Sequence, residues 1–256
     1  MPMCLGTTVV TALSPRCGLP KFGSGLNTNA IHFGLMGIRM SYANKMEIFG
    51  EGEPAEYLYE VVRGLVRGCK MLSDGRRQII GFHMPGDVFG IELDEYHRFS
   101  AEAVNNATVL AVKRSIIMGL AARDVDFARQ LCAVTSREYQ RAQNHLVILG
   151  CMSARQRLAI FLLRMTLRSS NNNEIELSMS RRDVADYLGL TTETVSRTIT
   201  QFENDALIGV ASRRRIVLRD YAALARVAAH EDYTASYRHA TCGHNEVCSL
   251  SAETVD

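Results

Sequence analysis

The stretch "MSRRDVADYLGLTTETVSRTITQF", residues 179–202, decides the fold of this 256-residue chain. Ser180, with Asp183 three residues later, forms a capping-box pattern, in which each side chain satisfies a free backbone N–H of the first helical turn. Apolar residues follow at helical spacing until Gly189, where the helix must end because glycine tolerates positive φ. The first half of the stretch therefore predicts a short helix that ends in a sharp turn.

The second half, "TTETVSRTITQF" (191–202), predicts another amphipathic helix. Its inner face is formed by Val195, Ile199 and Phe202. A second face carries polar side chains at i, i+3, i+4 and i+7, namely Glu193, Ser196, Arg197 and Thr200. Two short helices joined by a tight turn that contains glycine are a helix-turn-helix.

The segment "ALIGVASRRRIVLRD" (206–220) predicts a strand, a basic turn and a second strand, which we interpret as a wing. Arg213, Arg214 and Arg215 fall at its tip and are suited to phosphate contacts, which position a protein on DNA without specifying sequence. The complete set of residues predicted to contact phosphates or to position the helix is Ser180, Arg181, Thr191, Thr192, Thr194, Thr200, Arg213 and Arg214.

Base recognition in DNA would explain why the polar face of residues 191–202 combines a carboxylate, a hydroxyl and a guanidinium. Guanine offers two acceptors that a bidentate arginine matches, and cytosine offers a donor that a carboxylate accepts. We therefore expect Glu193, Ser196 and Arg197 to read base edges in the major groove. The alternative is an intrahelical ion pair between Glu193 and Arg197, which their i, i+4 spacing also permits. The preceding turn and the following basic hairpin favour base reading.

Upstream, from Met46 to Val112, the signals are those of β-structure. Short runs such as those at 57–62, 65–72, 77–82 and 108–112 are separated by Gly, Pro and Asp of the kind that tight turns need. Many short strands at close spacing predict a sandwich or barrel.

From Asp126 onward, more than twenty residues without Gly or Pro predict one long helix. We expect one stripe of this helix to form a dimer seam, and its members are Phe127, Leu131, Val134, Glu138, Arg141, His145 and Ile148. The alternative is that the stripe packs against the chain's own β domain, and both arrangements can hold along different parts of the helix.

Composition sets broad limits on the kind of protein. With 47% hydrophobic and 22% charged residues the chain is globular, and no apolar run approaches the roughly 20 residues of a membrane helix, so we expect a cytoplasmic protein. No nucleophile–base pattern, phosphate-binding loop or zinc-protease motif occurs, so we expect no enzyme. Seven cysteines include no CxxC pair, and we expect no metal site. Cys132 and Cys151 could serve a redox switch, although buried inert thiols are the favoured interpretation.

These motifs resemble a known family. Residues 179–208 are similar to the DNA-binding domain of the CRP/FNR superfamily, in particular its FNR/FixK branch, whose E-x-x-S-R element is here Glu193, Ser196 and Arg197. Residues 51–92 are similar to the β-roll sensory domain of FixK-type regulators, and the resemblance spans roughly 36–228. It implies a homodimeric transcription regulator, most simply an activator, that binds a palindrome of double-stranded DNA with TTGA-type half-sites and works with RNA polymerase.

The chain departs from the ligand-binding branches of this superfamily. Only Cys4 and Cys17 lie in the N-terminal region, and the strand expected to carry a distal cluster ligand reads "TVLAV" (108–112), so we expect no iron–sulfur cluster. Where cyclic-nucleotide-binding members pair Arg with Ser or Thr, Phe99 separates Arg98 from Ser100. We therefore expect no cofactor. The resemblance then implies a FixK-like regulator of microaerobic respiration, nitrogen fixation or denitrification. The alternative is a ligand- or redox-responsive sensory module of the same fold.

The sequence thus predicts an α+β protein with an N-terminal β-roll, a long dimerisation helix and a C-terminal winged helix-turn-helix. The expected boundaries are a loose extension at 1–40, the β-roll at 41–125, the dimerisation helix at 126–150, the DNA-binding domain at 151–229 and a frayed tail at 230–256.

Overall fold

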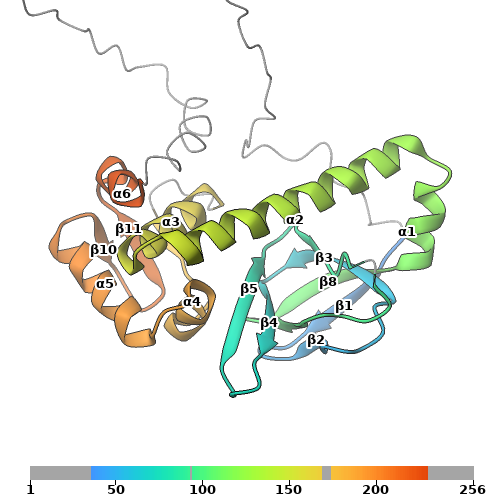
Figure 1. Ribbon diagram of the computed structural model, residues 1–256, viewed down its shortest axis with the longest axis horizontal. Coiled ribbons are helices and arrows are strands. Elements are labelled where there is room, and N and C mark those ends of the chain that lie inside the picture. The colour runs from blue at the N-terminus through green and yellow to red at the C-terminus, as the bar shows by residue number, and fades with distance from the viewer. Residues whose placement is uncertain (1–35, 93, 169–173, 230–256) are drawn as a thin grey trace, which may run out of the picture.

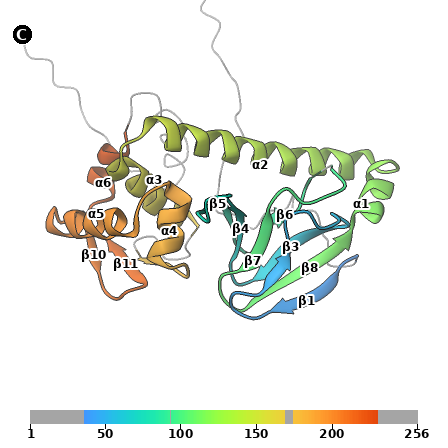
Figure 2. The ribbon, with the colours of Figure 1, turned by 60° about the horizontal axis from the view of Figure 1, so that its bottom comes forward.

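The computed structural model describes residues 36–92, 94–168 and 174–229 (Figure 1). A β-rich body lies against one half of the long helix α2 (Val125–Cys151), and a mainly helical body lies at the other end of this helix (Figure 1, Figure 2). The predicted α+β architecture is confirmed. Within the described ranges, every helix is too short or too polar to cross a bilayer.

The β-rich body is a roll of two antiparallel four-stranded sheets. One sheet has the order β1-β8-β3-β6 and the other β2-β7-β4-β5. The strands are β1 (Ile38–Tyr42), β2 (Glu47–Phe49), β3 (Tyr57–Arg63), β4 (Val66–Met71), β5 (Arg77–His83), β6 (Val88–Phe89), β7 (Ser100–Ala103) and β8 (Ala107–Lys113). The four runs predicted as strands correspond to β3, β4, β5 and β8, and each of these strands contains buried apolar residues.

The first strand corrects the predicted N-terminal boundary. Residues 38–40 were expected to belong to the loose extension, but Ile38 pairs with Ala111 and Met40 with Val109 in an antiparallel ladder between β1 and β8. Ile38 and Met40 are 66% and 41% exposed, so this edge strand is held by backbone hydrogen bonds and shows no inward apolar alternation. Residues 1–35 of the expected extension and the expected tail at 230–256 lie outside the described residues.

Helix α2 packs against its own chain along the stripe that the sequence assigned to a dimer seam. Near its start, Phe127, Leu131 and Val134 join a cluster with residues of the roll and of α1 (Arg114–Ala121). Near its end, the His145 ring stacks on Tyr187 with centroids 4.1 Å apart, and Ile148 is 2% exposed in a second core. A side chain buried inside one chain has no surface left for a second chain, so Val134, His145 and Ile148 are corrected from dimer contacts to intrachain contacts.

The polar members of the same stripe also contact the roll or each other. Arg141 pairs with Glu138 one turn away and with the buried carboxylate of Asp87 at 3.3 Å. The sequence could not separate this arrangement from a dimer seam, because both need an amphipathic helix with the same period. The alternative of packing on the chain's own β domain holds for the first part of this stripe, whereas His145 and Ile148 pack in the helical body.

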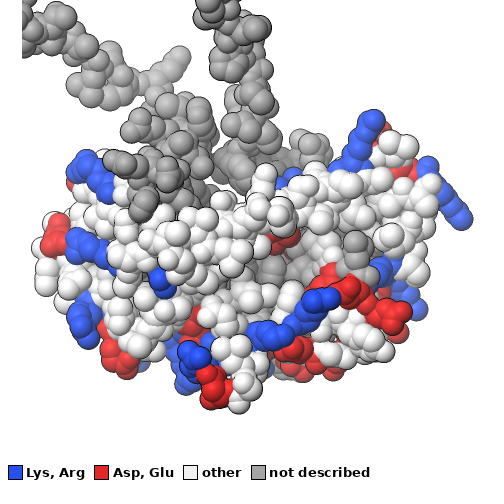
Figure 3. All heavy atoms as spheres, in the orientation of Figure 1, with Lys and Arg blue, Asp and Glu red and all other residues white. Residues whose placement is uncertain are grey.

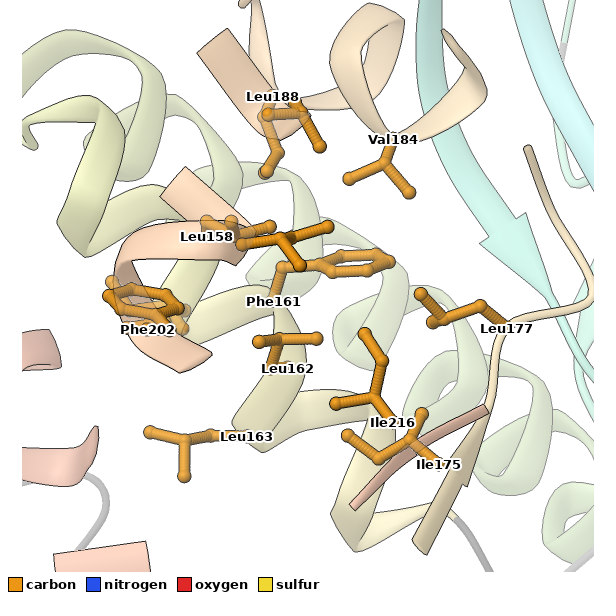
Figure 4. Packing of buried hydrophobic residues seen from close by; sticks show 14 of the residues in the cluster. Leu158, Phe161, Leu162, Leu163, Ile175, Leu177, Val184, Leu188, Phe202 and Ile216 are labelled. Carbon is orange, nitrogen blue, oxygen red and sulfur yellow. The ribbon is translucent and has the colours of Figure 1, made fainter. Parts of the chain in front are cut away.

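The helical body is organised around α3 (Ala154–Leu167), which Ser153 caps with a capping box. Leu158, Phe161, Leu162 and Leu163 of α3 lie at the centre of the largest core, and Figure 4 shows residues from several other elements pointing toward them. The elements that contribute residues to this core are β9 (Glu174–Glu176), α4 (Arg181–Leu188), α5 (Thr192–Asn204), β10 (Ile208–Val210), β11 (Arg215–Leu218) and α6 (Tyr221–Ala228). This core sets the mutual placement of α4 and α5.

Two buried histidines predict how stability depends on pH. Burial lowers the pKa of His83 and of His145 to about 4, with nearby arginines acting in the same direction. The unfolded value is near 6.5, so between these values the unfolded chain binds more protons than the folded one. The free energy of unfolding should therefore be highest above about pH 6.5 and fall as the pH drops toward 4. The buried Asp87 and Asp183 have lowered pKa values, so their contribution is lost only below about 3.8.

His145→Phe tests this assignment, because phenylalanine can keep the ring stack on Tyr187 but does not titrate. The free energy of unfolding, measured with urea, should fall from pH 7 to pH 5 in the wild type. In the variant this fall should be smaller by on the order of 2 kcal/mol. An unchanged difference between the two pH values would contradict the role of His145.

Candidate nucleic-acid interface

The first helix of the predicted pair, α4, begins with the expected capping box. The Ser180 hydroxyl accepts from the Asp183 backbone N–H at 3.1 Å, and the Asp183 carboxylate accepts from the Ser180 backbone N–H at 3.0 Å. The same hydroxyl also donates to Asp183 Oδ2 at 2.7 Å. The Ser180 side chain, predicted to contact a phosphate, is thus engaged in starting the helix.

The turn between the helices is the one that glycine allows. Gly189 has φ of 62°, and the Leu190 backbone N–H donates to the Ala185 carbonyl at 3.0 Å, which closes the end of α4. Thr191 then caps α5 by accepting from the Thr194 N–H at 3.1 Å. The helix-turn-helix therefore follows directly from local sequence signals.

Arg157 reinforces this turn, although no sequence motif identifies it. Its guanidinium donates to three backbone carbonyls, those of Leu149, Met152 and Leu188, at 2.8–2.9 Å. One side chain thereby joins the end of α2 to the end of α4. The available signal was an arginine next to the apolar run of α3, where a half-buried guanidinium needs hydrogen-bond acceptors.

Helix α5 separates its faces as predicted. Val195, Ile199 and Phe202 are at most 4% exposed, whereas Glu193, Arg197 and Thr200 are exposed. Over the described residues no ion pair joins Glu193 to Arg197, although the helical spacing permits one. Ser196 is half-buried and accepts from the Arg181 guanidinium at 3.3 Å. The Glu193 carboxylate and the Arg197 guanidinium are thus both exposed to solvent on the same face of α5.

The threonines of α5 that were predicted to contact DNA lie at its N-terminus or along its exposed side. Thr191 and Thr194 share a hydroxyl–hydroxyl hydrogen bond of 3.0 Å, and Thr192 is half-buried in the first turn. Thr200 donates to the Ser196 carbonyl at 3.2 Å. The N-terminus of a helix presents free backbone N–H groups that favour anions, so Thr191, Thr192 and Thr194 surround a surface suited to phosphate.

The predicted wing forms a three-stranded antiparallel sheet in the order β10-β11-β9. Arg213 and Arg214 are exposed in the turn between β10 and β11, where the Arg214 N–H donates to the Ser212 hydroxyl at 3.3 Å. Arg215 begins β11 and pairs with Glu174 of β9 at 2.7 Å, so it faces back along the sheet. Figure 3 shows basic side chains at several points on the outer edge of this body, interleaved with acidic ones.

The residues of the roll do not fit a cyclic nucleotide. Arg98 pairs with Asp94 and its side chain is 74% exposed, so it does not face the interior. The interior holds stacked rings instead, with Phe49 against His97 at 3.6 Å and Tyr59 against Phe89 at 5.2 Å. A hollow of about 460 Å³ on the outside includes Lys70 and Arg98, but Glu51 and Asp94 neutralise them.

The described cysteines only partly follow the expectation of buried thiols. Cys69 is buried, and burial raises the pKa of its thiol to about 11. Cys132 and Cys151 are exposed on α2, contrary to expectation. No cluster of three metal-ligating side chains occurs in the described part of the chain.

Together, the roll, the long helix and the winged helix-turn-helix define a DNA-binding transcription regulator. Two family models match the chain, a cyclic nucleotide-binding domain at residues 39–124 and a Crp-like helix-turn-helix domain at 156–227. The chain belongs to the CRP/FNR family of transcription regulators and is of the FixK type.

Particular relatives support this assignment. The chain is 47% identical over 197 residues to the nitrogen fixation regulation protein FixK of Azorhizobium caulinodans, covering 75% of this chain and 79% of that protein. It is 36% identical to the transcriptional activatory protein AadR of Rhodopseudomonas palustris, over 65% of this chain and 72% of that protein. The structure of FixK2 from Bradyrhizobium japonicum superposes with a TM-score of 0.74 at 47% identity, covering 76% of this chain and 98% of that one. These relatives are regulators and not enzymes, in agreement with the sequence.

Substituting Gly189 tests the turn. Its left-handed conformation costs an L-residue about 1–2 kcal/mol, and an added Cβ would meet Leu149 and Arg157 at 3.4 and 3.5 Å. Gly189→Ala should lower the free energy of unfolding by at least this amount, measured by chemical denaturation. Gly119→Ala is the control, because Gly119 lies in α1 with nothing within 4 Å, and alanine there should stabilise by about 0.5–1 kcal/mol. Equal effects at both positions would contradict the assigned turn.

Proposed function

We propose that the protein binds a palindrome with TTGA-type half-sites as a homodimer, and that α5 of each subunit reads one half-site. The observation that carries the proposal is the unpaired, exposed placement of Glu193 and Arg197 on a helix held by a glycine turn. In the major groove Arg197 matches the two acceptors of guanine, Glu193 accepts from cytosine and Ser196 contacts a base edge or phosphate.

Phosphate contacts hold this reading helix in register. Arg213 and Arg214 on the wing, and Arg181 at the start of α4, supply guanidinium groups. The N-terminus of α5, with Thr191, Thr192 and Thr194, supplies backbone N–H groups and hydroxyls, and Thr200 flanks the reading face. Such contacts strengthen binding to every sequence and make it depend on salt.

The exposed side of α2 supports a homodimer with a seam different from the one expected. Val125, Tyr139 and Leu146 are 64–69% exposed and lie seven or fourteen residues apart, with Cys132 completing the series. Small residues occupy the intermediate positions of this heptad pattern, namely Ala128, Thr135 and Ala142. Over the middle of α2, the visible surface in Figure 3 is largely uncharged. An apolar heptad repeat opposite the roll is the pattern of a two-helix seam.

The biological role proposed here rests on the relatives. The FixK proteins are named for regulation of nitrogen fixation and AadR as a transcriptional activator. We place this protein in the cytoplasm as an activator, in contact with RNA polymerase, of genes for nitrogen fixation, microaerobic respiration or denitrification. The lack of fit between the roll and a cyclic nucleotide supports activity without a cofactor.

Arg197→Ala tests base reading, and Arg214→Ala is the matched arginine variant on the wing. In fluorescence anisotropy with ligand-free, reduced protein, Arg197→Ala should cost about 1–3 kcal/mol on the TTGA palindrome and relax selectivity at the guanine. Arg214→Ala should weaken all sequences similarly and reduce the salt slope by about 1. Retention of full selectivity by Arg197→Ala would remove the assignment of α5 as the reading helix.

Leu146→Glu tests the dimer seam, because it places a charge where two apolar stripes meet. The variant should sediment as a monomer at concentrations where the wild type is a dimer, and its affinity for the palindrome should fall. Asn144→Glu adds the same charge on an exposed side of α2 away from the stripe and should leave the dimer intact. A dimeric Leu146→Glu protein would rule out this seam.

A further inference from the structure

A first ion cluster joins the roll to α4, the helix that precedes the reading helix. Arg67 of β4 and Arg77 of β5 both donate to Asp183 Oδ1, at 2.8 and 2.6 Å, and Arg77 also pairs with Asp186 at 2.6 Å. The four side chains are between 7% and 19% exposed. Glu102 of β7 holds Arg67 from the other side.

A second ion cluster joins the roll to α3 and has the opposite polarity. Asp87, in the turn between β5 and β6, is 8% exposed and accepts from Arg168 at the C-terminal end of α3 at 2.5 Å. Arg141 of α2 approaches the same carboxylate at 3.3 Å, and the Met84 backbone N–H donates to it at 2.8 Å. Here the roll contributes the carboxylate, Asp87, and the helical body contributes the guanidinium of Arg168.

These two clusters constrain rotation in a way that apolar packing does not. Between them, Tyr187 of α4 packs on Phe82 of β5, with ring centroids 5.3 Å apart, and such a contact tolerates sliding. A buried charge that loses its partner is strongly unfavourable. Any rotation of the helical body relative to the roll would separate the ion pairs of one cluster or the other and would carry this cost. Two attachment points on different helices, α3 and α4, fix an orientation that one point would leave free.

We propose that the two clusters set the orientation of the helix-turn-helix relative to the roll and α2, and thereby select the spacing between half-sites. The residues Arg77, Asp186, Asp87 and Arg168 are then positioning residues, which act on DNA recognition through α4 and α3. This inference rests on the proposed binding of a palindrome by a dimer. In such a dimer both reading helices must meet successive major grooves at one separation, so their orientation is part of the recognition.

The test compares two DNA duplexes, one with TTGA-type half-sites at the preferred spacing and one with an extra central base pair. Arg77→Met opens the first cluster and Arg168→Met opens the second, and neither changes the capping residue Asp183 or the reading face. Arg76→Met is the matched control, because among the described residues Arg76 pairs only with Asp74 of its own hairpin, and its side chain is 78% exposed. Asp186→Asn and Asp87→Asn are milder substitutes if circular dichroism shows that a methionine variant is unfolded.

The measured quantity is the ratio of the two affinities in fluorescence anisotropy. We expect Arg77→Met and Arg168→Met to lower the preference for the correct spacing by roughly 2- to 30-fold, the range for substitutions that alter coupling between sites. Arg76→Met should keep the wild-type ratio. A purely structural role would weaken both duplexes equally and leave the ratio unchanged, and that result would overturn the inference.

Failure of the proposed function would be visible separately, in the wild type alone. If the wild type does not prefer the palindrome to unrelated DNA, the dimeric reading of half-sites is wrong and the inference falls with it. If the wild type binds the palindrome but accepts both spacings equally, only the inference is overturned.

Discussion

The carboxylate of Asp183 is the point on which the structure depends most. It completes the capping box that starts α4 and, at the same time, accepts from Arg67 and Arg77 of the roll. Burial acts to raise the pKa of Asp183, but the Ser180 hydrogen bonds and these two arginines outweigh it and lower the pKa, so the group is ionised at neutral pH. One side chain thus belongs both to the local geometry of the helix-turn-helix and to the contact between the two bodies. The placement of α5 follows from it, because α5 is joined to α4 by a closed turn.

Local signals explain which parts of this fold were predictable. The caps, Gly189 and the inner face of α5 act over a few residues, so the sequence alone located both helices and the wing. The intrachain contacts of Val134, His145 and Ile148 could not be predicted, because α2 has two apolar stripes and the sequence period does not say which one packs against the chain's own domains. The ion clusters were missed because Arg67 and Asp183 are 116 residues apart and only the folded chain brings them together.

The roll has the architecture of a sensory domain, but its chemistry points to a structural role. Stacked rings fill the interior, and the cations near the outer hollow are neutralised by carboxylates. Arg77 and Asp87 of the roll instead form ion pairs with the helical body, through Asp186 and Arg168. If these ion pairs set the DNA-binding orientation, as we propose, no ligand is needed to reach it, which agrees with the proposed effector-free activity.

The central claim is that ligand-free protein reads two inverted half-sites through α5. It is tested most directly by selecting binding sites from random-sequence duplexes with the purified, reduced wild type and no added nucleotide or metal. If α5 of each subunit reads one half-site, a palindrome with TTGA-type half-sites at one fixed spacing will be enriched. Recovery of no motif, or of a single asymmetric site, would contradict it.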